Sequence, residues 1–275
     1  MTALAPDAPA VSAAPGAPPR RLSPLTALAN TFTLTWRSLL KLRTNPEDIF
    51  GLVLTPVMYL VLFTYLFGGA ISGNVHNYLQ FELPGILVLA VIFSTLGTGQ
   101  ALSEDIRTGV FDRFRSLPIS RSAPLAGAVL GDVTRYALSV AITLAFGMLL
   151  GFRIQGSPLA AAAACLLVLV FALAMCWLSA LLGLVAGSAR GVQWIGSLIY
   201  FPLTFGSNVL VPTDKLPGWL QAFVKGNPMT FLTEAERGLL VGGPVATPVI
   251  RTLLWSLGLF LVFAPLAVQV YRRRT

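Results

Sequence analysis

Six long runs of apolar residues constrain the fold of this chain more than any other feature of its sequence. Each run is about as long as the roughly 20 residues that a helix needs to cross the hydrocarbon core of a bilayer. Five of the runs contain no Asp, Glu, Lys or Arg, and the third contains Asp132 and Arg135 near its start. We therefore predict an all-α, polytopic membrane protein with six transmembrane helices, near residues 49–67, 83–102, 125–150, 158–186, 192–211 and 252–271.

The composition agrees with this fold class. Hydrophobic residues make up 55% of the 275 residues and charged residues only 11%, and the mean hydropathy is +0.77. A soluble domain is about one quarter charged. The net charge of +8 could suggest a nucleic-acid partner, but the basic residues gather at the ends of the apolar runs. With six spans, most of these basic residues lie on the same side of the membrane as the N-terminus. Since the cytoplasmic side of a membrane protein carries the excess of Lys and Arg, we expect both termini in the cytoplasm and no nucleic-acid partner.

Two segments precede the first apolar run. Residues 1–22 are rich in Ala and Pro, which predicts a disordered cytoplasmic tail. Residues 23–46 have apolar residues at helical spacing and polar residues on the opposite side, which predicts an amphipathic helix along the inner membrane surface; a cytosolic helix is the alternative. Residues 47–275 then form the transmembrane domain. The interfacial and basic residues of this amphipathic helix include Trp36, Arg37, Lys41 and Arg43.

A charged segment, residues 103–121, separates the second and third apolar runs. Thr108-Gly109 is expected to end the preceding helix, and a short helix follows that Leu117-Pro118 ends. In this helix Val110, Phe111 and Phe114 form an apolar ridge, while Asp112, Arg113 and Arg115 point elsewhere. Such a helix suits docking into a cleft of a soluble partner. A plain basic loop on the cytoplasmic side is an equally good interpretation of these residues.

Two further regions have open interpretations. Asp132 and Arg135 are three residues apart on one helix face, which predicts an ion pair near the headgroups, with a proton relay as the alternative. Between the fifth and sixth runs, residues 212–251 contain Trp219 and Phe223 four residues apart. We expect two short helices half-embedded in the outer leaflet here, and a plain external loop is the alternative.

The sequence contains none of the common catalytic motifs. There is no GxxxxGK[ST] phosphate loop and no GxSxG nucleophile elbow. His76 is the only histidine, so an HExxH zinc site is excluded. We expect no catalytic residue, no metal and no cofactor in this chain, and we expect that it is not an enzyme.

The charged segment resembles the cytoplasmic loop of ABC-2 type exporter permeases, and the daunorubicin/doxorubicin-resistance branch of that family is a close match. The matching pattern is Asp105-x-x-x-Gly109-x-x-Asp112-Arg113-Phe114-Arg115-x-Leu117-Pro118-x-x-Arg121. Further pieces agree in order and spacing: Tyr65-Leu66-Phe67-Gly68-Gly69, Tyr78-Leu79-Gln80-Phe81-x-Leu83-Pro84-Gly85, Ser207-Asn208-Val209-x-Val211-Pro212, Pro217-Gly218-Trp219-Leu220-Gln221-Ala222-Phe223 and Arg237-Gly238. One departure is that the family commonly carries glutamate where Asp105 and Asp112 stand.

The resemblance implies a coupling helix that docks onto a separate ATPase subunit, present in two copies, which the interface helix also touches. ATP and Mg²⁺ would bind that partner. It further implies two permease chains, as a homodimer or a heterodimer, in the plasma membrane of a bacterium. The expected coupling residues are Arg107, Gly109, Val110, Phe111, Asp112, Arg113, Phe114, Arg115, Leu117 and Pro118. The central route would be lined by the first, second and fifth spans, with Met58, Phe63, Phe93, Phe205 and Asn208 as candidates.

The function implied is export of a small amphipathic, drug-like or antibiotic-like compound, in contact with membrane lipid. Export of a lipid or a polysaccharide is an alternative that the same family also performs. An ATP-independent carrier or an intramembrane enzyme would need titratable groups at mid-span, and a carrier often has an internal repeat, neither of which the sequence suggests.

Overall fold

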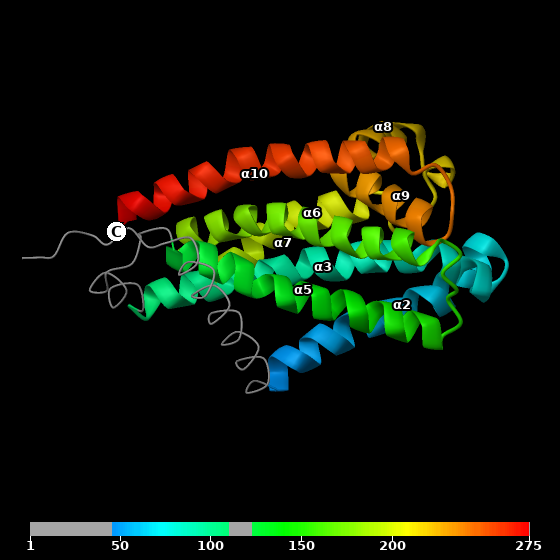
Figure 1. Cartoon of the computed structure of the whole chain (residues 1–275), viewed down its shortest axis with the longest axis horizontal. Coiled ribbons are helices and arrows are strands. Elements are labelled where there is room, and N and C mark those ends of the chain that lie inside the picture. The colour runs from blue at the N-terminus through cyan, green and yellow to red at the C-terminus, as the bar shows by residue number, and fades with distance from the viewer. Residues whose placement is uncertain (1–45, 110–122, 275) are drawn as a thin grey trace, which may run out of the picture.

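The computed structural model of this protein describes residues 46–109 and 123–274, which are helical throughout apart from short connections. Long helices lie side by side, and two short helices gather at the end of the bundle opposite the C-terminus (Figure 1). We call this end the outer end, because the connections predicted to be external lie there. The elements are α2 (Pro46–Ser72), α3 (Val75–Arg107), α5 (Ala123–Leu149), α6 (Pro158–Val185), α7 (Ala189–Phe205), the 3-10 turn η1 (Thr213–Lys215), α8 (Gly218–Gly226), α9 (Pro228–Leu240) and α10 (Ala246–Arg274).

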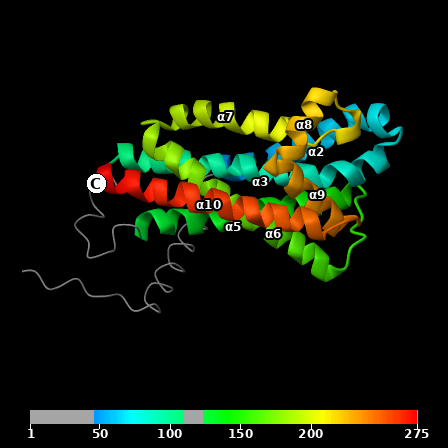
Figure 2. The same cartoon turned by 90° about the horizontal axis from the view of Figure 1, so that it is seen from above.

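Helix α3 lies at the centre of the bundle. It packs against α2, α5, α6, α7 and α9, and Figure 2 shows α7 on one side of it and α5 and α6 on the other. Most of its residues between Tyr78 and Ser103 are buried. The apolar core is therefore built around one helix that runs the length of the molecule.

Helices α3 and α6 approach each other closely at Gly99 and Gly183. A Cβ atom added to Gly183 would lie 2.4 Å from the carbonyl oxygen of Gly99. The backbone N–H of Gly99 donates a hydrogen bond of 3.2 Å to the Ser179 hydroxyl on α6. Small residues at such a crossing let two helix backbones approach, which is how membrane helices gain packing contacts.

Each of the six predicted spans corresponds to a helix in the part of the chain that the structure describes. Four of the helices are long and apolar enough to cross a membrane by themselves, namely Val75–Arg107, Gly131–Leu149, Pro158–Val185 and Ala246–Tyr271, and Leu54–Gly69 is a shorter apolar helix within α2. The second helix starts at Val75 rather than at residue 83, because Asn74 caps it by accepting a hydrogen bond of 2.8 Å from the His76 N–H. Glu82, predicted to lie just outside the second span, is thus inside a helix.

The fifth predicted span, 192–211, is too long. Helix α7 ends at Phe205, and residues 206–211 form turns. The amide of Asn227 donates hydrogen bonds of 2.7 Å to the carbonyls of both Leu203 and Gly206. These are acceptors that a further helical turn would have used, so a side chain from a later segment ends the helix.

The external region contains the two predicted short helices, α8 and α9, so a plain loop is the wrong interpretation there. Trp219 and Phe223 are both exposed on α8, at 77% and 49%. Helix α9 is mostly buried and packs against α6, α10 and α3. The half-embedding in the outer leaflet stays a prediction. The predicted tail, the interface helix with Trp36, Arg37, Lys41 and Arg43, and most of the coupling helix lie outside the described residues.

Candidate functional site

The inner end of α3 has the form that the sequence predicted. The helix ends at Arg107. The N–H of Thr108 donates to the Glu104 carbonyl at 2.9 Å, and the N–H of Gly109 donates to the Ile106 carbonyl at 3.2 Å. Gly109 has a φ of 69°, in the left-handed region that glycine adopts without strain. Arg107 is exposed and pairs with Glu104 at 2.6 Å. The remaining coupling residues, 110–118, lie outside the described residues.

A group of polar residues joins α3 to α5 in the inner half of the bundle; we call it the inner polar cluster, and it consists of Thr98, Asp132, Arg135 and Tyr136. Thr98 donates a hydrogen bond to the Asp132 carboxylate and shares one of 2.7 Å with the Tyr136 hydroxyl. Arg135 pairs with Asp132 at 3.4 Å. The predicted ion pair is present, and it also connects α5 to α3, which the sequence did not predict.

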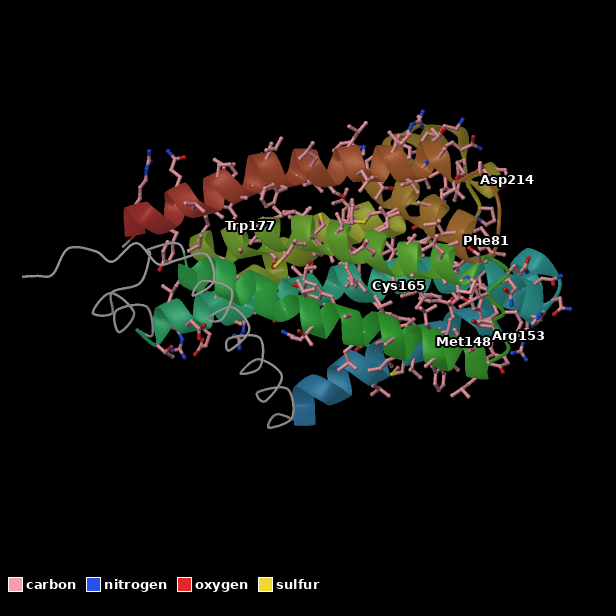
Figure 3. All side chains as sticks on the ribbon, in the orientation of Figure 1. Phe81, Met148, Arg153, Cys165, Trp177 and Asp214 are labelled. Atoms are coloured by element: carbon pink, nitrogen blue, oxygen red, sulfur yellow. The ribbon has the colours of Figure 1, made fainter. Side chains whose placement is uncertain are left out.

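A second polar group lies at the outer end; we call it the outer polar cluster, and it consists of Tyr78, Glu82, Asn208, Glu234 and Arg237. Arg237 is its centre. Its Nε donates to the Phe81 carbonyl at 2.9 Å, and one Nη donates to the carbonyls of Asn208 and Val209 at 2.7 and 3.0 Å. The guanidinium lies 3.6 Å from the centroid of the Phe81 ring, which Figure 3 labels near the outer end. One side chain therefore holds α9, α3 and the segment after α7 together.

The segment after α7 needs these partners. Residues 206–211 are not helical, so their carbonyls do not accept hydrogen bonds from N–H groups of a following helical turn. If these carbonyls are buried, other donors must bond to them. Arg237 satisfies those of Asn208 and Val209, and the Tyr78 hydroxyl donates to that of Leu210 at 2.9 Å. Three consecutive carbonyls are thus bonded by side chains of α3 and α9.

The acidic members of the outer polar cluster occupy different surroundings. Glu82 is fully buried and accepts a hydrogen bond of 2.7 Å from Thr64 on α2. Glu234 accepts one of 3.1 Å from the Asn208 amide. Burial raises the pKa of Glu234, and the charges of Arg237 and Arg251 oppose that shift. Burial lowers the pKa of Arg237, and Glu234 opposes that change, but a guanidinium stays charged at neutral pH.

The structure brings some of the predicted route residues together and separates others. Phe93 on α3 contacts Phe201 on α7 at a centroid distance of 5.4 Å, and Phe201 stacks on Phe205 at 5.5 Å. Phe93 and Phe205 therefore belong to one aromatic row between α3 and α7. Met58 is exposed on α2, and Phe63 is half-buried there.

Asn208 differs from the other route candidates because it is buried within the outer polar cluster. Only 4% of its surface is exposed, and its side-chain amide is bonded to Glu234. Its side-chain amide and its carbonyl are bonded to Glu234 and Arg237, so Asn208 ties the segment after α7 to α9. In this conformation it does not line a surface that a solute could reach.

Helix α7 has two distinct faces. Val192, Gly196, Tyr200 and Thr204, four residues apart, are buried against the rest of the chain. The opposite side is an exposed apolar stripe, defined by Trp194, Leu198, Phe201 and Phe205. Exposed apolar surface of this size contacts lipid or another protein surface.

The sequence did not predict that Glu82 and Glu236 are buried, or that Arg237 is the centre of the outer polar cluster. The predicted second span begins at residue 83, which leaves Glu82 outside it. One signal was available: α9 has an apolar residue at most positions around these charges, which is unusual for a helix exposed to water.

Comparison with known proteins places these features in a family. The model of the ABC-2 type transporter family matches residues 29–241. The daunorubicin resistance ABC transporter permease protein DrrB1 of Streptomyces coeruleorubidus is 43% identical over 249 residues, which cover 90% of this chain and 88% of that protein. The doxorubicin resistance ABC transporter permease protein DrrB of Mycobacterium tuberculosis is 29% identical over 250 residues, covering 83% and 86%. The chain therefore belongs to the ABC-2 type transporter family of permeases.

Proposed function

We propose that this chain is the transmembrane subunit of an ATP-binding cassette exporter that moves an amphipathic, drug-like compound out of a bacterial cell. The energy comes from ATP, with Mg²⁺, hydrolysed by a separate ATPase subunit in two copies. The names of the relatives above, which refer to daunorubicin and doxorubicin resistance, support this class of substrate. Six spans with both termini in the cytoplasm fit the basic residues and the helix lengths.

The observation that carries the proposal is the continuity of α3. This helix runs without a break from Val75 to Arg107. Its inner end leads directly into the segment that resembles a coupling helix, and its outer end is bonded through Phe81 to Arg237. Movement of the docked coupling segment therefore has a direct mechanical connection to the outer polar cluster, since coupling of this kind acts through rigid elements.

The exposed stripe of α7 supports pairing with a second permease chain. Its residues Trp194, Leu198 and Phe201 are apolar and adjoin the aromatic row that includes Phe93. A second chain that covered this stripe would enclose a route lined by α2, α3 and α7. Disulfide cross-linking of a Leu198→Cys variant, with Leu254→Cys on the exposed face of α10 as control, tests that arrangement.

The test of the proposal is reconstitution with the cognate ATPase in proteoliposomes. We expect ATP-dependent transport of an amphipathic fluorescent cation such as doxorubicin, and no transport by the permease alone. Reversal of charge at Arg113 and Arg115 should abolish substrate-stimulated ATP hydrolysis, whereas reversal at the exposed Arg153 in the outer α5–α6 connection should not. Transport of lipid but not of doxorubicin would show that the substrate is a lipid and not a drug-like compound. Uptake driven by a proton gradient without an ATPase would refute the proposal.

A further inference from the structure

Within residues 46–109 and 123–274, a carboxyl group on α9 has no hydrogen-bond partner. Glu236 is fully buried, and neither of its carboxylate oxygens has a hydrogen-bond partner among the residues that the structure describes. It differs in this from Glu82, which is bonded to Thr64, and from Glu234, which is bonded to Asn208. Neither the family comparison nor the proposed transport cycle gives Glu236 a role.

The surroundings of Glu236 are apolar. Along α9 its neighbours at helical spacing are Leu232, Thr233, Leu239 and Leu240, all of which are buried. The Thr233 hydroxyl donates to the Met229 carbonyl at 2.8 Å, so it is already engaged. On the other side of the packing interface, α6 contributes small and apolar residues to the same core. An ionised carboxylate in such a place would lose its hydration without any replacement.

The charged groups near Glu236 face other partners. On α9, Arg237 points to the carbonyls of α3 and of residues 208–209, and Glu234 bonds to Asn208. On α10, Arg251 lies 5.1 Å from the Phe231 ring centroid.

The remaining elements packed against α9 offer Glu236 no cation. On α3, Tyr78 and Glu82 belong to the outer polar cluster. On α6, Cys165, labelled in Figure 3, is within electrostatic range of Glu236 and is a thiol. On α8, Lys225 is exposed, and on α7 the described charged residue is Arg190, at the opposite, inner end of that helix.

Burial alone therefore sets the ionisation of this group. It raises the pKa of Glu236 well above its usual range, and no neighbouring charge acts against the shift. Burial without a polar partner favours the neutral, protonated form of the carboxyl while α9 is packed against α6 and α10.

We propose that Glu236 is a proton-binding site that couples the packing of α9 to the pH outside the cell. The proton is bound when α9 is packed. When α9 separates from α6 and α10, water reaches the carboxyl and the proton leaves to the external solution. Opening of the outer end thus releases one proton for each chain, and external acid favours the packed state.

The sign and size of the effect follow from linkage. The packed state has the higher affinity for the proton, so it is fully favoured below the pKa of a hydrated glutamate, about 4.3. Above that pH the opening equilibrium of α9 rises about tenfold per pH unit, until it levels off at the pKa of the packed state. A glutamine at this position stays neutral in both states, so its opening equilibrium does not depend on pH in this range.

Hydrogen–deuterium exchange of the α9 amides measures that opening equilibrium in the full chain, in lipid nanodiscs with its ATPase. Intrinsic exchange rates depend on pH, but they cancel when the exchange rate of the wild type is divided by that of Glu236→Gln at the same pH. We expect this ratio to rise about tenfold per pH unit from pH 5 upward until it levels off. Glu234 has a partly exposed carboxyl two residues away, so Glu234→Gln is the matched control. The exchange rate of the wild type divided by that of Glu234→Gln should change much less with pH.

The proposal would be overturned if the ratio of the wild-type exchange rate to that of Glu236→Gln stayed constant from pH 5 to pH 8. If Glu236→Gln does not fold, wild type alone suffices, because the α9 amides can be referenced to the α6 amides in the same sample. Equal pH dependence of the two helices would then refute the proton site. These outcomes do not depend on transport, so they are separate from the failure of the proposed exporter function.

Discussion

Replacement of Arg237 by methionine tests whether one side chain holds the outer end together. Methionine has a similar length but no donors, so it leaves three carbonyls, those of Phe81, Asn208 and Val209, without their hydrogen bonds. Each buried group left unpaired costs about 1–3 kcal/mol, and loss of the contact with the Phe81 ring costs about 1 kcal/mol more. Since Arg237 is only half-buried, and water can reach part of the site, we expect a total near the lower end, about 3–5 kcal/mol.

Thermal unfolding of the purified chain in nanodiscs is the assay. A loss of 1 kcal/mol lowers the Tm of a chain of 150–250 residues by about 2–4 °C, so we expect Arg237→Met to lower the Tm by roughly 10 °C. Arg237→Lys keeps the charge and one or two of the hydrogen bonds, so its Tm should lie between those of the wild type and Arg237→Met. The matched control is Arg251→Met, whose side chain is exposed and only approaches the Phe231 ring at 5.1 Å. Equal Tm values for the two methionine variants would refute the reasoning.

Three other expectations concern the remaining parts of the chain. Glutamate at both Arg113 and Arg115 should leave the permease inserted and folded but reduce substrate-stimulated ATPase activity of the complex at least tenfold; unchanged activity would count against docking. Membrane-impermeant maleimide should label a cysteine at position 219 in place of Trp219 from outside, and one at position 115 only after permeabilisation, whereas the opposite pattern would reverse the topology. Gly183→Leu, which forces α3 and α6 apart, should lower the yield of folded protein and its Tm strongly, whereas Gly258→Leu, with open space around its Cβ position, should change the Tm by less than about 2 °C, and equal effects would show that the crossing is not tight.

The helices could be predicted from the sequence because long apolar runs leave a membrane chain few alternatives. The end of α3 was also predictable, since Thr108-Gly109 is a local signal and Gly109 has the expected positive φ. The end of α7 was not, because the amide that ends it belongs to Asn227, which is 21 residues beyond Gly206. A boundary set by a distant side chain leaves no trace in the local pattern.

The polar contacts could be predicted only within one helix. Asp132 and Arg135 are three residues apart, so helical spacing alone predicted their ion pair. Their connection to Thr98 depends on how α3 and α5 pack, which periodicity does not specify. The same holds for Arg237, whose acceptors lie 28 to 156 residues away in sequence.

The close crossing of α3 and α6 near Gly99 divides the central helix into a short segment and a long segment. At 1.5 Å per residue, the crossing is about 12 Å from the end of α3 at Arg107 and about 36 Å from its start at Val75. A rigid tilt about this crossing would turn a displacement of about 1 Å at the Arg107 end into roughly 3 Å at the Val75 end. Pro84, which lies within the helix about 22 Å beyond the crossing, would be the place where the helix bends first. A small displacement of the Arg107 end would therefore reach the hydrogen bond between the Phe81 carbonyl and Arg237.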